Sequence, residues 1–259
     1  MNHARRRYYA PRDGKEVLED EQTKSNWTDE KEMTYSWVQS RLENKENGKR
    51  FTFVKDMVFT INGDLEFEFL PRVKCKHTFL IRNPLAAYLS FKQAISVDPE
   101  FNEVPFSVSS GIRDASLIDD YGFFPIKSCY EQLFRLWKDV GKLEGANPII
   151  IDADELTRTP DILLRKYFEA VGFPWKKEYL TWDAGYEITK SWKTSRQRMD
   201  STLETWRIWH QRSMESSRFI PRTKPLPSFE DLTLDLQEYV LAAMPYYEEM
   251  YKCRMRACP

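Results

Sequence analysis

Glycine is scarce in this 259-residue sequence, and the positions of the few glycines exclude the common phosphate-binding loops. The nine glycines are scattered along the chain, at Gly14, Gly48, Gly63, Gly111, Gly122, Gly141, Gly145, Gly172 and Gly185. A loop whose backbone amides surround a phosphate needs glycines close together, as in G-x-G-x-x-G or G-x-x-x-x-G-K-[ST]. Neither pattern can be drawn through these positions, so the sequence disfavours a P-loop kinase or NTPase.

Cysteine and histidine are also few, which argues against a metal site. The chain has Cys75, Cys129, Cys253 and Cys258 as its cysteines and His3, His77 and His210 as its histidines. None of the cysteines forms a C-x-x-C pair, and no histidine pair stands at the spacing of a zinc site. Four cysteines in so long a chain do not make a disulfide framework, so we expect a reducing compartment and no bound metal.

Long apolar runs and net charge are absent as well. No stretch of 18 or more apolar residues exists, so nothing in the sequence predicts a transmembrane helix. The arginines at 5–7 are not followed by the apolar segment of a secretory signal. The 39 basic and 40 acidic side chains give a net charge of −1, whereas a general binder of nucleic acid or membrane surfaces needs a basic field. We expect a soluble, cytoplasmic protein that binds neither.

Aromatic residues, in contrast, are abundant: 8 tryptophans, 13 tyrosines and 16 phenylalanines. A chain of this length with so many large apolar side chains can build a real core. We find no internal repeat and no linker. The sequence therefore predicts an irregular N-terminal arm over residues 1–28 and one domain over residues 29–259, with a Trp-rich C-terminal portion.

Short apolar strands alternate with helices along the middle of the chain. We expect buried strands at 51–55, 76–82 and 148–152, helices at 29–46, 84–95, 126–142, 156–171 and 231–244, and an irregular connection at 98–124. Strands that are apolar throughout, rather than alternating, are typical of a parallel sheet covered on both faces. The predicted fold is α/β, a three-layer sandwich with a central parallel sheet flanked by helices.

Ligands of such sheets bind beyond the carboxyl ends of the strands. The polar residues that follow the three expected strands are Lys55–Asp56, Arg82–Asn83 and Asp152–Asp154. These side chains are the candidates for a site.

Residues 79–90, FLIRNPLAAYLS, place an arginine at a strand end and a serine eight residues later. The segment resembles the strand–Arg–x7–Ser–helix motif of the sulfotransferase superfamily, enzymes with a P-loop NTPase-like fold that use 3′-phosphoadenylyl sulfate (PAPS). The resemblance implies that Arg82 and Ser90 hold the 3′-phosphate of PAPS, because an arginine offers a fork of donors to phosphate oxygens. The alternative is a structural ion pair for Arg82 and a core-facing Ser90.

Two further segments extend the resemblance over residues 51–175. Residues 53–57, FVKDM, are similar to the family's strand ending in Lys-x-His, although Met57 stands where the histidine base is expected. The resemblance implies Asp56 as the base that takes the acceptor's proton and Lys55 as a contact of the sulfuryl group. A turn or cap role for Asp56 and a solvent-reaching Lys55 remain open. Residues 151–174 are similar to a helix segment that marks the fold.

One part of the family pattern is missing. No Pro-Arg-[ST]-x-[ST] loop, which binds the phosphosulfate end of PAPS, precedes residue 51, so the resemblance implies an N-terminally truncated member. Two functions follow: transfer of a sulfuryl group from PAPS to a hydroxyl or amine of a small-molecule acceptor, or an inactive paralogue that binds a nucleotide or a partner. Whether the chain is an enzyme stays open. The segment Ser216–Phe219 faintly resembles distant relatives that carry an aminotransferase-like label, but we find no pyridoxal-phosphate motif.

Overall fold

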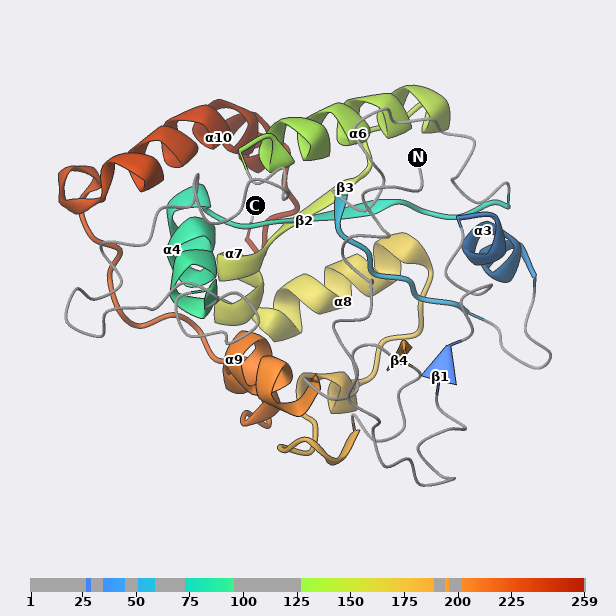
Figure 1. The fold of residues 1–259 in the computed structure, drawn as a ribbon. Coiled ribbons are helices and arrows are strands. Elements are labelled where there is room, and N and C mark those ends of the chain that lie inside the picture. Colours follow the sequence, from blue (N-terminus) through green and yellow to red (C-terminus); the bar gives the residue numbers. More distant parts are fainter. Residues whose placement is uncertain are drawn as a thin grey trace, which may run out of the picture.

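Two short apolar stretches of the sequence pair as parallel strands, and helices surround them (Figure 1). The computed structural model describes residues 27–28, 35–44, 51–58, 73–95, 127–188, 194–195 and 202–258. Its elements are β1 Trp27–Thr28, α3 Tyr35–Glu43, β2 Thr78–Ile81, α4 Pro84–Ile95, α6 Cys129–Glu144, β3 Ile149–Asp152, α7 Ala153–Arg158, α8 Pro160–Val171, β4 Thr194–Ser195, α9 Thr202–Met214 and α10 Leu234–Lys252, with short 3-10 helices at Lys177–Leu180 and Phe229–Asp231.

The strands β2 and β3 confirm the predictions for residues 76–82 and 148–152. They run parallel, with Thr78 opposite Ile149 and Ile81 opposite Asp152. The strands β1 and β4 form a second, two-residue parallel pair. The C-terminal segment also reaches β3, because the backbone N–H of Met255 donates to the carbonyl oxygen of Ile150 at 2.8 Å.

Helices cover both faces of the β2–β3 pair (Figure 1). Ile150 packs in a large cluster with side chains of α4, α6 and α10, whereas the next residue, Ile151, packs against Leu163 and Tyr167 of α8. Successive side chains of a strand point to opposite faces, so the two clusters lie on opposite sides of the sheet. Around this strand pair the layers are helix, sheet and helix. The larger sandwich predicted for the whole chain stays a prediction.

Proline and glycine set the helix boundaries. The expected helix 156–171 is two helices, α7 and α8, because Pro160 lacks the N–H that a continuous helix would need. Gly172 ends α8 in the left-handed region, with φ of 73°, where glycine carries no steric penalty. The helix α4 matches its predicted bounds. The helix α10 runs past the expected end at residue 244 and through Pro245, and its buried Ala243 and Met250 belong to the larger cluster.

One strand prediction is wrong. Residues 51–57 have no regular secondary structure, and the side chain of Phe53 is 71% exposed. Phe51 instead packs its ring against Phe173, with 4.6 Å between centroids. A strand needs a partner backbone as well as apolar, β-branched residues, and the described residues offer none to this segment. The expected arm over 1–26, the connection over 98–124 and the start of the first helix near residue 29 lie outside the described residues.

Among the helices that the structure describes, none is both long and apolar enough to cross a membrane.

Candidate functional site

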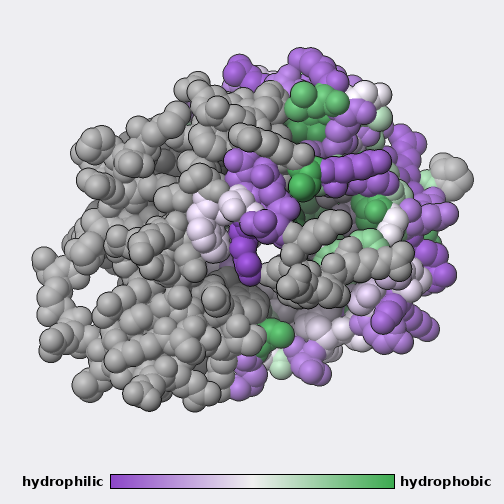
Figure 2. Space-filling model, turned by 90° about the vertical axis from the view of Figure 1, so that its right-hand side faces the viewer, coloured by the Kyte–Doolittle hydropathy of each residue, from purple (hydrophilic) through white to green (hydrophobic). Residues whose placement is uncertain are grey.

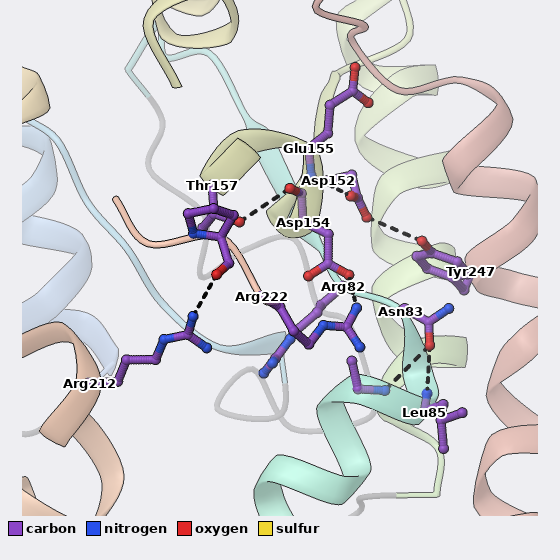
Figure 3. Close-up of polar contacts among 12 residues, drawn as sticks. Arg82, Asn83, Leu85, Asp152, Asp154, Glu155, Thr157, Arg212, Arg222 and Tyr247 are labelled. Atoms are coloured by element: carbon purple, nitrogen blue, oxygen red, sulfur yellow. Dashed lines mark hydrogen bonds and ion pairs between the residues drawn. The ribbon is translucent and has the colours of Figure 1, made fainter. Parts of the chain in front are cut away.

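The carboxyl ends of β2 and β3 meet at one edge of the sheet (Figure 3). Because Ile81 lies opposite Asp152, the residues that follow, Arg82 and Asn83 on one strand and Asp154 on the other, share that edge. The sequence predicted that the polar residues after all three expected strands share one edge, and the structure confirms this for two of the three.

Asn83 has a structural role at this edge. Its side-chain oxygen accepts hydrogen bonds from the backbone N–H groups of Leu85 at 3.0 Å and Ala86 at 3.4 Å. Asn83 therefore caps α4, and Pro84 occupies the first helical position, where its missing N–H costs nothing. The carbonyl oxygen of Arg82 accepts a 2.7 Å hydrogen bond from the hydroxyl of Tyr130. These contacts fix the backbone at the end of β2.

Asp152 is structural as well. Its side chain is buried, accepts from the backbone N–H of Glu155 at 2.9 Å and accepts from the hydroxyl of Tyr247 at 3.2 Å. Burial raises the pKa of this carboxyl, against the lowering effect of the two hydrogen bonds. Asp152 thus starts α7 and joins it to α10.

Asp154, two residues later, faces the other way and pairs with Arg222 at 2.6 Å (Figure 3). Both side chains are about a quarter exposed, at 21% and 25%. The loop that carries Arg222 is held by α9, since Arg212 donates to the carbonyl oxygens of Ile220 at 3.1 Å and Pro221 at 2.9 Å. The loop is therefore tied to α9 through Arg212 and to α7 through the pair of Arg222 with Asp154.

A cavity of about 330 Å³ lies between α7 and this loop. Its lining residues are Asp154, Arg158, Pro221, Arg222, Thr223, Lys224, Pro225 and Leu226. Three of these side chains are cations and one is an anion, so the lining carries a net positive charge. Within the described part of the chain no hydrogen-bonding partner of Arg158 or Lys224 is seen, and both side chains are exposed. The charge of Arg158 also contributes to lowering the pKa of Glu155, but neither its guanidinium nor the amino group of Lys224 makes a hydrogen bond among the described residues. The cavity therefore offers the hydrogen-bond donors of both cations to a ligand.

The residues predicted from the sequence are spread over several places. Arg82 is half-buried at the strand edge, and Ser90 is exposed on α4. Lys55 and Asp56 are exposed on the irregular segment 51–58 rather than at a strand end, and the carboxylate of Asp56 accepts a 2.7 Å hydrogen bond from the next backbone N–H, at Met57. The positive charge of Lys55 contributes, after burial, to lowering the pKa of His210 on α9.

The sequence reasoning missed Arg158, Arg222 and Lys224. The signal in the sequence was the run Pro221–Pro225, PRTKP, in which two basic residues stand between two prolines. Arg222, within this run, contacts Asp154, which lies 68 residues earlier in the chain. No pattern within the loop itself predicts that partner.

Sequence comparison relates the chain to two proteins of Arabidopsis thaliana. It is 29% identical over 169 residues to branched-chain-amino-acid aminotransferase-like protein 1, covering 63% of this chain and 23% of the relative. It is 27% identical over 181 residues to branched-chain-amino-acid aminotransferase-like protein 2, covering 70% of this chain and 25% of the relative. The chain thus spans about a quarter of the length of the curated relatives it matches. No family model matches, and no solved structure matches.

These comparisons overturn the resemblance to sulfotransferases. The matched proteins are named for aminotransferases, so sulfuryl transfer, PAPS as co-substrate and the P-loop-like assignment are wrong predictions. The matches do not support the inactive nucleotide- or partner-binding paralogue either. The physical reason for the error lies in residues 79–90: Asn83 and Pro84 form an ordinary helix start, and such a start after a strand recurs in unrelated proteins.

Proposed function

We propose that this chain is the ligand-binding part of an aminotransferase-like protein and that it binds the anionic group of a small molecule in the cavity between α7 and residues 221–226. The observation that carries the proposal is the pair of exposed cations, Arg158 and Lys224, that lines this cavity and makes no hydrogen bond among the described residues.

The cavity suits an anion because its cations come from two fixed elements. Arg158 ends α7, and Lys224 lies on the loop that Arg212 holds against α9. Asp154 neutralises Arg222 and orients its guanidinium, which leaves the other two cations for the ligand. An arginine binds a carboxylate or a phosphate through two parallel hydrogen bonds, and the hydroxyl of Thr223 adds a donor to the lining.

The names of the relatives favour a carboxylate as this anion. A branched-chain amino acid or its 2-oxo acid combines a carboxylate with an aliphatic side chain. The cavity combines its cations with the aliphatic surfaces of Pro221, Pro225 and Leu226. Small-molecule sites are typically built in this way, from apolar walls and a few polar groups that fix the orientation. A phosphate would use the same cations without the aliphatic wall.

Pyridoxal phosphate, the cofactor of aminotransferases, does not fit the described residues. Its chemistry needs a lysine amine that is activated by desolvation or by a neighbouring cation. Lys92 is buried, but its amino group is bonded to the carboxylate of Asp235 and the hydroxyl of Thr233. Lys224 faces the cavity but is exposed. We therefore assign no transamination step to these residues.

Titration calorimetry at low and high salt tests the proposal, with 4-methyl-2-oxopentanoate, L-leucine, inorganic phosphate and pyridoxal phosphate as probes. A hydrogen bond to a charged group contributes about 1.5–3 kcal/mol. We therefore expect Arg158→Gln or Lys224→Gln to weaken binding of the oxo acid by roughly tenfold or more. The matched control is Arg165→Gln on α8, whose guanidinium pairs with Asp161 away from the cavity lining.

Three outcomes decide the matter. Binding of the oxo acid that falls in both cavity variants and not in the control supports the proposal. Binding of phosphate without the oxo acid overturns the carboxylate assignment and keeps the anion site. Failure of all four probes to bind, or unchanged affinity in the cavity variants, overturns the site itself.

A further inference from the structure

A thiol, an imidazole and a carboxylate lie in series at the start of β2, at the opposite end of the strand from the cavity. The Sγ of Cys75 is 3.7 Å from Nε2 of His77, and Nδ1 of His77 is 2.6 Å from Oε1 of Glu144. Cys75 is exposed, and the side chains of His77 and Glu144 are 27% and 29% exposed. Figure 2 views the molecule from this side, where the described surface is mostly hydrophilic with small hydrophobic patches.

The carboxylate fixes the direction of proton flow. An ionised carboxylate only accepts hydrogen bonds, so Nδ1 of His77 carries the proton that Glu144 accepts. The other ring nitrogen, Nε2, is then free to accept a proton from the thiol of Cys75. Glu144 itself is held at the end of α6, where Gly145 adopts a left-handed conformation with φ of 66°, and it also accepts from the backbone N–H of His77 at 3.4 Å.

The same geometry argues against a metal site. Glu144 and Cys75 contact different nitrogens of one imidazole ring, and these nitrogens point away from each other. The three groups therefore cannot converge on one ion. Over the described ranges no group of three or more histidine, cysteine, aspartate or glutamate side chains is placed to hold a metal.

We propose that Cys75 is a reactive thiol that exchanges with small-molecule disulfides of the glutathione type, with His77 as its general base and Glu144 as a positioning residue. Nε2 of His77 takes the S–H proton, and the sulfur of Cys75 attacks one sulfur of the disulfide. A new S–S bond forms to Cys75, the original S–S bond breaks, and the leaving thiolate takes the proton from His77. Exchange of this kind requires a thiolate and access, whereas acyl transfer would also require donors for an oxyanion.

His77 is needed as a base because the thiol of Cys75 does not ionise readily by itself. Partial burial and the charge of Glu144 raise the pKa of Cys75 above its usual value, so the resting group is the thiol. The other charged neighbours are Lys74 and Lys76 in the same segment, and the amino group of Lys76 is bonded to the carbonyl oxygen of Ala170.

The other three cysteines are internal controls. Cys253 and Cys258 are exposed, as Cys75 is, but the described residues place no histidine against either thiol. Cys129 is half-buried, and burial raises the pKa of its thiol to about 11. Accessibility alone would make Cys75, Cys253 and Cys258 react alike.

The test measures the rate of mixed-disulfide formation at each cysteine of the full chain, with glutathione disulfide as the probe and mass spectrometry of the cysteine peptides as the readout, from pH 5 to 9. General base catalysis by a positioned side chain contributes roughly 10²–10⁴-fold, so we expect Cys75 to react at least about tenfold faster than Cys253 and Cys258 at pH 7. We expect His77→Gln to lower the rate at Cys75 to that of Cys253 and to shift its rise to higher pH. A rate at the half-buried Cys129 that stays as slow as in the wild type shows that the variant is folded.

Glu144→Gln separates positioning from plain electrostatics. The charge of Glu144 raises the pKa of the thiol, so removal of the charge alone would speed the reaction at Cys75. If Glu144 orients His77, the same substitution slows it. Equal rates at Cys75 and Cys253 in the wild type, no effect of His77→Gln, or a faster Glu144→Gln variant would each overturn the proposal. None of these outcomes bears on the cavity at the other end of β2.

Discussion

Replacement of Lys92 by methionine should destabilise the fold more than any loss of a surface ion pair. Lys92 lies on α4 and its side chain is 2% exposed, while that of its partner Asp235 is 10% exposed. The amino group donates to both carboxylate oxygens of Asp235, at 2.9 and 3.1 Å, and to the hydroxyl of Thr233 at 3.0 Å. These bonds tie α4 to the start of α10 at the edge of the larger cluster.

The size of the effect follows from burial. Lys92→Met keeps most of the aliphatic stem but removes the cation that donates to both carboxylate oxygens of Asp235, whose side chain is 10% exposed. Breaking a buried pair by removal of one partner costs about 3–5 kcal/mol. Replacement of both charges, in Lys92→Met with Asp235→Leu, should cost less than the sum of the two single variants, because well-packed apolar groups are often neutral replacements for a buried pair.

Urea unfolding followed by tryptophan fluorescence measures these losses, since Trp137 is buried in the same cluster. The control is Lys142→Met, which removes an ion pair with Asp139 on the surface of α6; there Lys142 is 77% exposed, and exposed pairs contribute about 0–1 kcal/mol. A loss below about 1 kcal/mol in Lys92→Met would refute the argument from burial, and so would additive losses in the double variant.

Two further predictions concern helix ends. Burial tends to raise the pKa of Glu155. Hydrogen bonds from the backbone of Ala257 and from Arg254, with the charges of Arg254 and Arg158, hold it below the ordinary value of 4.5. The ionised Glu155 therefore contributes stability above pH 4.5, and this stability is lost as the pH falls through the lower pKa of the folded state. The difference in free energy of unfolding between wild type and Glu155→Gln should shrink between pH 5 and pH 3. A difference that stays constant over this range would contradict the prediction. Gly172→Ala places a side chain at φ of 73° and should lower the free energy of unfolding by about 1 kcal/mol, measured by thermal unfolding. Gly172→Asn should lose less, because asparagine adopts the left-handed region more readily. Equal losses in the two variants would speak against the backbone explanation.

The elements best predicted from the sequence are those that local residues determine. The apolar runs at 76–82 and 148–152 form β2 and β3, and Pro84 marks the first residue of α4. Each depends on burial of a short apolar run or on the missing N–H of proline, and both effects act within a few residues. The prediction failed for 51–55, where the composition was typical of a strand but no described segment pairs with this backbone.

The site could be predicted only in part. The meeting of Arg82 with Asp152 and Asp154 follows from parallel pairing, because the carboxyl ends of such strands share an edge. The pairing of Asp154 with Arg222 depends on how the loop after α9 folds back over α7. Hydrogen bonds from Arg212 to backbone carbonyls hold that arrangement. Every residue has a backbone carbonyl, so the sequence of the loop does not predict these bonds.

The wrong family assignment also arose because a local sequence pattern does not determine long-range contacts. An arginine at a strand end followed by Asn-Pro and a helix satisfies two physical requirements at once, a capped helix start and a terminated strand. Such a segment recurs wherever a strand turns directly into a helix, so its presence says little about the ligand. The discriminating contacts are those between distant segments: Asp154 with Arg222 across 68 residues and His77 with Glu144 across 67.

Those two long-range contacts lie at opposite ends of β2. From Cys75 to Arg82 the chain advances seven residues, about 23 Å if fully extended at 3.3 Å per residue. Groups separated by more than about 10 Å and without shared partners act independently, and the cavity lining and the thiol cluster have no residue in common. A strand of four paired residues is thus enough to separate an edge with excess positive charge from an edge with a thiol, an imidazole and a carboxylate. One edge is suited to hold an anion and the other to move a proton.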